Sequence, residues 1–262
     1  MTTTLDIQRA GPVARVFLNR PDVRNAFNSQ VIADLKQAFA MLGSDDSVRA
    51  IVLGGHGKAF CAGGDLNWMR AMADYSWEQN RDDALALADM MWTVYSCPKP
   101  VVGRIHGDCF AGGVGLAACC DVLVAADGPN FCLSEARLGL LPATIGPYVV
   151  RALGEQASRR YFVTAERFST AEAHRLGFVQ VLVPADGLDA AVDGLVATLV
   201  ANGPQAVKAS KRLVQDIAGQ PITPVLREDT ARRIADIRAS DEGKEGVSAF
   251  LQKREPAWKL PA

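Results

Sequence analysis

The stretch CPKPVVGRIHGDCFAGGVGLAACCDV, residues 97–122, decides the fold. Its two prolines are followed by an apolar, β-branched run at 101–105, which predicts a strand. A glycine-rich turn at 111–115 comes next, then a short apolar helix, then a second strand at 122–125. A strand, a loop and a helix that leads into another strand form the repeating unit of a layered α/β domain.

The preceding residues predict the same unit again. Residues 13–18 predict a strand, and Asn28 or Ser29 is placed to cap a helix that Gly43 ends. A buried strand at 49–53 leads into a second glycine-rich loop, GGHGKAFCAGGD at 54–65. Residues 66–91 then favour a helix, and residues 178–183 favour a strand.

The last third of the chain has little strand character. Residues 205–218, 223–239 and 241–254 predict amphipathic helices, the first of them started by a proline. Their apolar faces exceed what a small bundle can bury alone, so we expect them to pack on other subunits. We therefore predict an α/β core over residues 1–195 and a helical oligomerisation region over residues 196–262.

Composition excludes several partners. The 262 residues carry 28 Lys and Arg against 29 Asp and Glu, so nucleic acid is not expected as a partner. The longest uncharged stretch, residues 194–207, is shorter than the about 18–20 residues of a membrane helix. The start, MTTTLDIQRAGP, lacks the basic and apolar segments of a signal peptide. We expect no membrane association, a cytoplasmic location and reduced cysteines.

Several chemical motifs are absent. The six cysteines form no C-x-x-C pair and the three histidines stand alone, so no metal site is predicted. No G-x-S-x-G motif supports a serine nucleophile. Residues 113–118, GVGLAA, match a loose dinucleotide fingerprint, but the loop before them is too long and the helix after them too short. We interpret that match as accidental.

Two glycine turns and one carboxylate remain as candidates for chemistry. N–H groups at two helix starts could form an oxyanion hole for a carbonyl group. Glu135 lies in an apolar stretch, FCLSEARLGLLP at 131–142, and burial would give it the raised pKa that a proton shuttle needs. Alternatively, the glycines only permit tight turns and Glu135 pairs with Arg137. Spacing alone leaves both interpretations open.

Several ordered blocks resemble the enoyl-CoA hydratase/isomerase (crotonase) family over nearly the whole chain. They are RPDVRNAFN (20–28), AFCAGGDL (59–66), the stretch 97–122, SEARLGLLP (134–142) and AFLQKREPAWK (249–259). The resemblance implies an α/β spiral of ββα units with a C-terminal helical trimerisation region. It also implies a homo-oligomer, either a trimer or a hexamer of two trimers. The substrate would be an acyl-CoA thioester, whose coenzyme A makes a separate cofactor unnecessary.

The resemblance also implies roles for particular residues. The N–H groups of Gly64 and Gly112 would hold the enolate oxygen, and Glu135 would move the proton. Residues implied to bind the substrate or its coenzyme A are Arg24, Ala26, Ala62, Asp65, Leu66, Asn67, Trp68, Gly113, Arg137, Phe250 and Lys253. Phe250 and Lys253 resemble family residues that contact coenzyme A, often from a neighbouring subunit. For Lys253, the alternative interpretation as a solvated charge in the tail is equally open.

Gly115 departs from the family pattern, because familiar hydratases have the first of two glutamates there. Glu135 alone could hydrate an enoyl chain, or it could move a proton from C2 to C4 in a Δ3,Δ2 isomerisation. Residues 133–168 resemble bacterial methylglutaconyl-CoA hydratases of leucine breakdown, which favours hydration of a branched or carboxylated substrate such as 3-methylglutaconyl-CoA. Arg137 would read a distal carboxylate or, as we favour, form a structural ion pair. Gly115→Glu is expected to raise hydration of crotonyl-CoA if the water site is otherwise intact.

One relative of the family is known for binding RNA, which raises a different class of function. The near-zero net charge and the absence of a basic helix argue against that role here.

Overall fold

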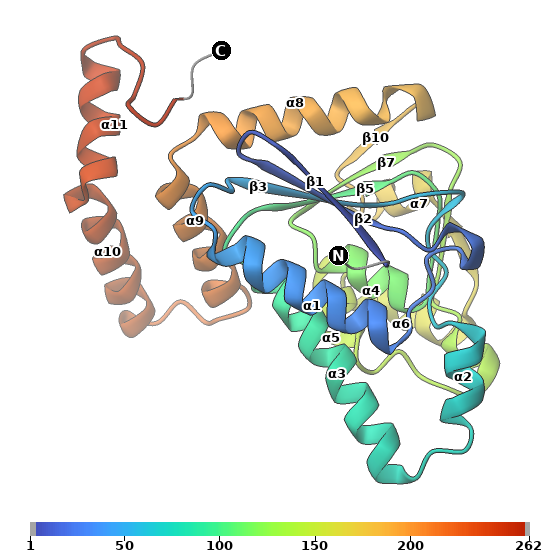
Figure 1. The fold of residues 1–262 in the computed structure, drawn as a ribbon. Coiled ribbons are helices and arrows are strands. Elements are labelled where there is room, and N and C mark those ends of the chain that lie inside the picture. Colours follow the sequence, from blue (N-terminus) through green and yellow to red (C-terminus); the bar gives the residue numbers. More distant parts are fainter. Residues whose placement is uncertain (1–3, 260–262) are drawn as a thin grey trace.

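The computed structural model describes residues 4–259, and a six-stranded sheet forms its centre (Figure 1). Its strands, in spatial order, are β1 (Leu5–Ala10), β2 (Val13–Leu18), β3 (Ala50–Gly55), β5 (Val101–Ile105), β7 (Val122–Ala126) and β10 (Val181–Val183). β1 and β2 are antiparallel, and the remaining neighbours are parallel. Parallel strands need crossover connections, which the helices provide.

A second, four-stranded sheet stands beside the first. Its strands, in spatial order, are β4 (Ala59–Cys61), β6 (Asp108–Phe110), β8 (Asn130–Cys132) and β9 (Arg167–Ser169). At β3–β4, β5–β6 and β7–β8, a strand of the large sheet is followed by a strand of the small sheet and then by a helix, which is the expected ββα unit. The short strands were not predicted, because three residues are too few for a periodic pattern.

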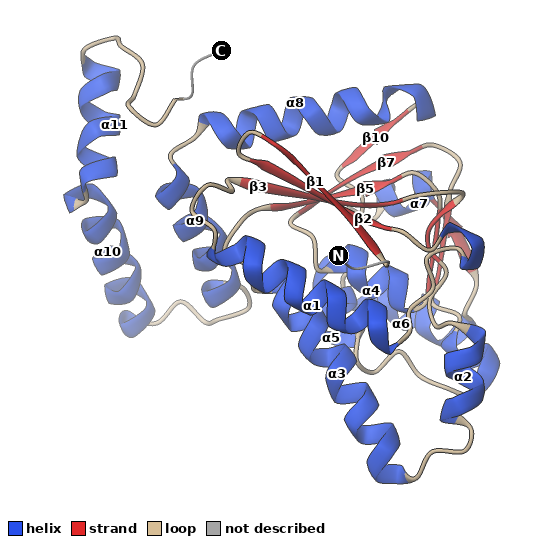
Figure 2. Ribbon diagram, in the orientation of Figure 1, coloured by secondary structure: helices blue, strands red, loops and turns tan. Residues whose placement is uncertain are grey.

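The large sheet is covered on both faces (Figure 2). Helix α8 (Leu188–Ala201) lies along one face, and α1 (Ser29–Ser44) and α3 (Trp77–Tyr95) lie on the other. Successive residues of β3 enter different cores: Ile51 packs on the α1 side and Val52 on the α8 side. Burial on both faces explains why β3 is a continuous apolar run rather than an alternating one.

Two predicted helices differ from the structure in their ends. Asn28 caps α1 as expected, accepting a hydrogen bond from the Val31 N–H at 3.0 Å, but the helix passes through Gly43 to Ser44. The predicted helix over 66–91 is broken into α2 (Leu66–Met72) and α3. The capping box of Ser76 starts α3 anew after the break. At the other end of the core, the predicted strand over 178–183 is reduced to β10.

The C-terminal helices extend away from the sheet at the left of Figure 1. They are α9 (Pro204–Ile217), α10 (Pro224–Ala239) and α11 (Asp241–Leu251). Helix α8 packs on the sheet and crosses residue 195, so the predicted division falls inside a helix of the core. The remaining helices are α4 (Gly112–Ala118), α5 (Gly146–Leu153), α6 (Glu155–Thr164) and α7 (Thr170–Arg175). Between residues 4 and 259, no helix is both long and apolar enough to cross a bilayer.

Candidate active site

The loop after β4 presents the first glycine turn. Phe27 donates its N–H to the Gly63 carbonyl at 2.7 Å and accepts from the Asp65 N–H at 2.8 Å. These two bonds bracket Gly64 in an isolated parallel bridge, so the polar groups of Gly64 itself face away from Phe27. Among the described residues, nothing accepts the Gly64 N–H. It is free to bind a ligand oxygen.

The second glycine turn starts α4. Gly112 is the first residue of this helix, and the first N–H groups of a helix have no partner inside it. Ala111 before it has φ 48° and ψ −121°, a conformation that costs a residue with a Cβ about 1–3 kcal/mol. A 2.8 Å bond from its N–H to the Cys132 carbonyl holds this turn in place. The Gly112 N–H has no acceptor within the described part of the chain.

The two turns touch at Gly63. A Cβ on Gly63 would lie 2.8 Å from the Ala111 Cβ and 3.7 Å from the Gly112 nitrogen, and its φ is +90°. Only glycine satisfies both the close approach and the positive φ. The free N–H groups of Gly64 and Gly112 are therefore neighbours from separate loops, an arrangement that can stabilise an oxyanion.

Glu135 supplies an unpaired carboxylate. It begins a short 3-10 helix, Glu135–Leu138, and its Oε2 is buried with no hydrogen-bond partner in residues 4–259. Burial raises the pKa of this carboxyl group, against a smaller lowering by its own backbone N–H. Arg137 does not pair with it, because its Nη2 donates to the Ala165 carbonyl at 2.5 Å. Arg137 thus makes a main-chain hydrogen bond in place of the structural ion pair that we favoured.

Arg20 ties the early loop to the first glycine turn, a role that the sequence did not reveal. Its guanidinium donates to Asp65 at 2.9 Å and to the Ala26 carbonyl at 2.7 Å. Asp65 also caps α2, accepting from the Asn67 N–H at 2.8 Å. Burial acts to raise the pKa of Asp65, but the hydrogen bonds from Asn67 and Arg20 together hold it below its usual value. Asp65 and Ala26 therefore use their polar groups to shape the site.

The other residues expected to bind coenzyme A divide into two groups. The side chains of Arg24, Leu66 and Asn67 are exposed around the first glycine turn, and Ala62 donates to the Arg24 carbonyl at 3.0 Å.

Trp68 lies beside the first turn, because a Cβ on Gly64 would lie 3.7 Å from its ring and 3.4 Å from Met69. Gly113 packs on β4, since its Cβ would lie 2.6 Å from the Cys61 carbonyl oxygen. Helix α11, which contains Phe250 and is followed by Lys253, lies across the molecule from α2, so it is not brought to the glycine turns within one chain (Figure 1).

The space beside Gly115 corrects one expectation. A Cβ there would lie 2.5 Å from the Ile145 Cβ and closer still to its Cγ2. Any side chain at position 115 would therefore overlap Ile145 unless Ile145 moves, which argues against the gain expected from Gly115→Glu alone. Ile145 is thirty residues away in sequence, so no local pattern could have revealed this contact.

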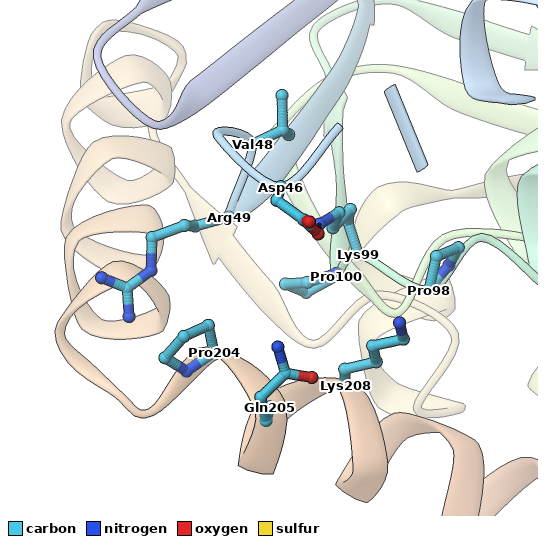
Figure 3. Close-up of a pocket in the computed structure, with 9 residues that line it drawn as sticks. All are labelled: Asp46, Val48, Arg49, Pro98, Lys99, Pro100, Pro204, Gln205 and Lys208. Atoms are coloured by element: carbon cyan, nitrogen blue, oxygen red, sulfur yellow. Dashed lines mark ion pairs between the residues drawn. The ribbon is translucent and has the colours of Figure 1, made fainter. Parts of the chain in front are cut away.

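Three cavities lie elsewhere, against the C-terminal helices. Their volumes are about 250, 360 and 660 Å³. The smallest is lined by Asp46, Val48, Arg49, Pro98, Lys99, Pro100, Pro204, Gln205 and Lys208 (Figure 3). None of the described residues that line these three cavities is Gly64, Gly112 or Glu135. In the described chain no three His, Cys, Asp or Glu side chains are grouped to hold a metal ion.

Comparison with known proteins gives a consistent result. The family described as enoyl-CoA hydratase/isomerase matches residues 8–261. The enoyl-CoA hydratase ACTT6 of Alternaria alternata is 34% identical over 257 residues, which cover 97% of this chain and 83% of that protein.

Two solved structures are also similar over nearly their whole length. An enoyl-CoA hydratase from Shewanella pealeana is 39% identical with a TM-score of 0.95, covering 98% of this chain and 97% of the other. Pseudomonas aeruginosa AtuE is 36% identical with a TM-score of 0.94, covering 98% of this chain and 100% of the other.

Proposed function

Since the chain belongs to the enoyl-CoA hydratase/isomerase family, we propose that it adds water to an α,β-unsaturated acyl-CoA thioester. The observation that carries this proposal is the combination of two free N–H groups, on Gly64 and Gly112, with the unpaired carboxylate of Glu135. The N–H pair suits a thioester oxygen that gains negative charge, and the carboxylate suits proton transfer.

The reaction divides between these groups as follows. The Glu135 carboxylate takes a proton from water while the water oxygen bonds to C3 of the enoyl chain. The C2–C3 π electrons form a double bond between C1 and C2, and the carbonyl π electrons move onto the thioester oxygen, where the N–H groups of Gly64 and Gly112 hold the enolate. The protonated Glu135 then returns its proton to C2, which restores the carboxylate and completes the addition of water.

The proposed substrate is branched or carboxylated, such as 3-methylglutaconyl-CoA. Support comes from two guanidinium groups near Glu135. Burial raises the pKa of the Cys132 thiol, and the positive charges of Arg137 and Arg167 oppose that rise. The two guanidinium groups therefore lie close to Cys132, which is three residues before Glu135 in the sequence. Among the described residues Arg137 makes one hydrogen bond, from Nη2 to the Ala165 carbonyl, which leaves the rest of its guanidinium group able to bind a carboxylate. Loss of selectivity for carboxylated esters in Arg137→Ala would support this assignment, and unchanged selectivity would refute it.

Isomerisation is the second candidate, and the lack of room for a carboxylate at Gly115 favours it. In that reaction Glu135 would take a proton from C2 of a 3-enoyl-CoA and return it at C4. The double bond would move from C3–C4 to C2–C3 through a dienolate, whose oxygen the N–H groups of Gly64 and Gly112 would hold. Hydration and isomerisation therefore need the same three groups and differ in whether water bonds to C3.

The test is a panel of 2-enoyl- and 3-enoyl-CoA esters, with and without a distal carboxylate, assayed for water addition and for double-bond migration. Glu135→Gln should lower kcat by about 10²–10⁴ while ester binding is retained. Glu155→Gln, an exposed carboxylate of α6, is the matched control and should keep the wild-type rate. Wild-type turnover in Glu135→Gln would remove Glu135 from the mechanism, and migration without water addition would select the isomerase.

We also propose that the protein is a homo-oligomer in which the α11 region of one subunit reaches the coenzyme A of another. The exposed apolar side chains of this region support it, since Phe250 is 82% and Leu251 is 73% exposed. Lys253 follows α11 and would meet the phosphate groups. Three expectations stay predictions: assembly as a trimer or a hexamer, the cytoplasmic location and a role in leucine breakdown.

A further inference from the structure

One face of α4 lies against two apolar side chains. Gly112 and Gly115 are three residues apart and so lie on the same face of the helix. A Cβ on Gly112 would lie 3.0 Å from the Phe27 ring, and a Cβ on Gly115 would overlap Ile145. Gly115, on which Ile145 packs, lies about 4.5 Å farther along the helix axis than Gly112.

Buried apolar atoms occupy the space beside Gly115. Ile145 is 2% exposed, and the Cε of the fully buried Met91 lies 3.4 Å from the position of a Cβ on Gly115. Ile145 is β-branched and therefore has little freedom at χ1. Its carbonyl accepts from Tyr148 at 3.1 Å and from Val149 at 3.0 Å, which fixes its backbone at the start of α5. The side chain cannot easily move aside.

Ile145 and Glu135 are placed by the same connection between β8 and α5. The Glu135 carbonyl accepts from Leu140 at 3.1 Å, and the Ala143 carbonyl accepts from Gly146 at 3.3 Å, so the segment between them is tied at both ends. This one segment thus contributes the unpaired carboxylate and the apolar residue against α4.

We propose that Ile145 is a specificity-determining residue of the active site, which fills the place one turn beyond the oxyanion donor and leaves Glu135 as the sole proton-transfer group. This inference rests on the proposed function. It means that position 115 can hold a carboxylate only when residue 145 is shortened. It also means that shortening residue 145 alone enlarges the acyl site near C3.

The experiment is a double-mutant cycle of wild type, Gly115→Glu, Ile145→Ala and the double variant. Gly115→Glu alone should lower the melting temperature by about 5 °C or more, because overpacking a closed core is destabilising. The double variant should regain at least half of that loss. It should also hydrate crotonyl-CoA at least about tenfold faster than wild type or Ile145→Ala, as a second proton-transfer group would provide.

A wild-type melting temperature in Gly115→Glu, or a stable double variant without faster hydration, would overturn the proposal. The melting temperatures test the packing even if no enoyl-CoA ester is turned over, in which case the proposed function fails separately.

If the double variant does not fold, Ile145→Ala decides on its own. It should raise kcat/KM for an ester with a bulky C3 substituent, relative to crotonyl-CoA, by at least about tenfold. Val149→Ala, in the helix that Ile145 precedes and at an equally buried position, is the matched control and should leave this ratio unchanged. Equal ratios in the two variants would overturn the proposal.

Discussion

Gly63→Ala tests whether the contact between the two glycine turns builds the oxyanion site. The added Cβ would lie 2.8 Å from the Ala111 Cβ and 3.2 Å from the Phe110 carbonyl oxygen. The turns must therefore separate by several tenths of an ångström. That shift changes the spacing between the N–H groups of Gly64 and Gly112.

The size of the effect follows from two contributions. The positive φ of 90° costs an alanine about 1–2 kcal/mol, and the steric overlap adds about 1–3 kcal/mol. Gly177→Ala is the matched control, because its φ is +80° but nothing lies within 4 Å of its Cβ position. Gly63→Ala should therefore melt below Gly177→Ala by about 2–12 °C, at about 2–4 °C per kcal/mol.

Thermal unfolding and steady-state kinetics on the preferred enoyl-CoA ester check both parts. Displacement of a single oxyanion donor typically costs about 10²–10³ in kcat, so Gly63→Ala should lose at least that factor while Gly177→Ala keeps the wild-type rate. If Gly63→Ala is destabilised but retains full activity, the N–H pair is not the oxyanion site. Equal stability of the two variants would refute the contact itself.

Three further predictions concern charge. Because burial raises the pKa of Glu135, kcat/KM should fall on the acid side at a pH above the ordinary 4.5, which a pH profile measures. Arg20→Ala should lower the free energy of unfolding by about 2–3 kcal/mol at pH 7, because Asp65 loses its ion-pair partner; breaking a fully buried pair costs about 3–5 kcal/mol. Urea unfolding should show a smaller decrease at pH 4 than at pH 7. Lys211→Met should lower the free energy of unfolding by about 3 kcal/mol at pH 7, because the Lys211 side chain is 8% exposed and forms an ion pair with Asp121. Burial raises the pKa of Asp121 and Lys211 opposes that rise, so the loss should shrink as the pH falls; a loss independent of pH would contradict this.

The sequence predicted the elements with strong periodicity and missed those whose length or contacts are set by tertiary structure. The strands β2, β5 and β7 and the cap of α1 follow from local pattern, and the structure confirms them within a residue. The small sheet is made of three-residue strands, which carry no period. Helix α1 passes Gly43 because that residue is buried against Pro98, 3.1 Å from its Cβ position, so packing overrides the stop signal.

The candidate site shows the same division. The two glycine turns and Glu135 were predictable, since backbone N–H groups and a carboxylate in an apolar stretch have recognisable local sequences. The ion pair between Arg20 and Asp65 and the packing of Ile145 on Gly115 join residues 45 and 30 positions apart. Pairs at such separations leave no trace in a single sequence, because neither side chain constrains its own neighbours.

Burial links the two chemical tasks of the site. The apolar side chains of Phe27, Met69 and Ile145 pack on the glycines that carry the turns, and burial also raises the pKa of Glu135. A low local dielectric strengthens the hydrogen bonds from Gly64 and Gly112 to an enolate oxygen. It also disfavours the ionised form of the Glu135 carboxyl group. A polar substitution in this apolar shell should therefore move the acid limb of the pH profile towards lower pH while it lowers the rate. An increase in both acid tolerance and rate would mean that the two effects do not share a cause.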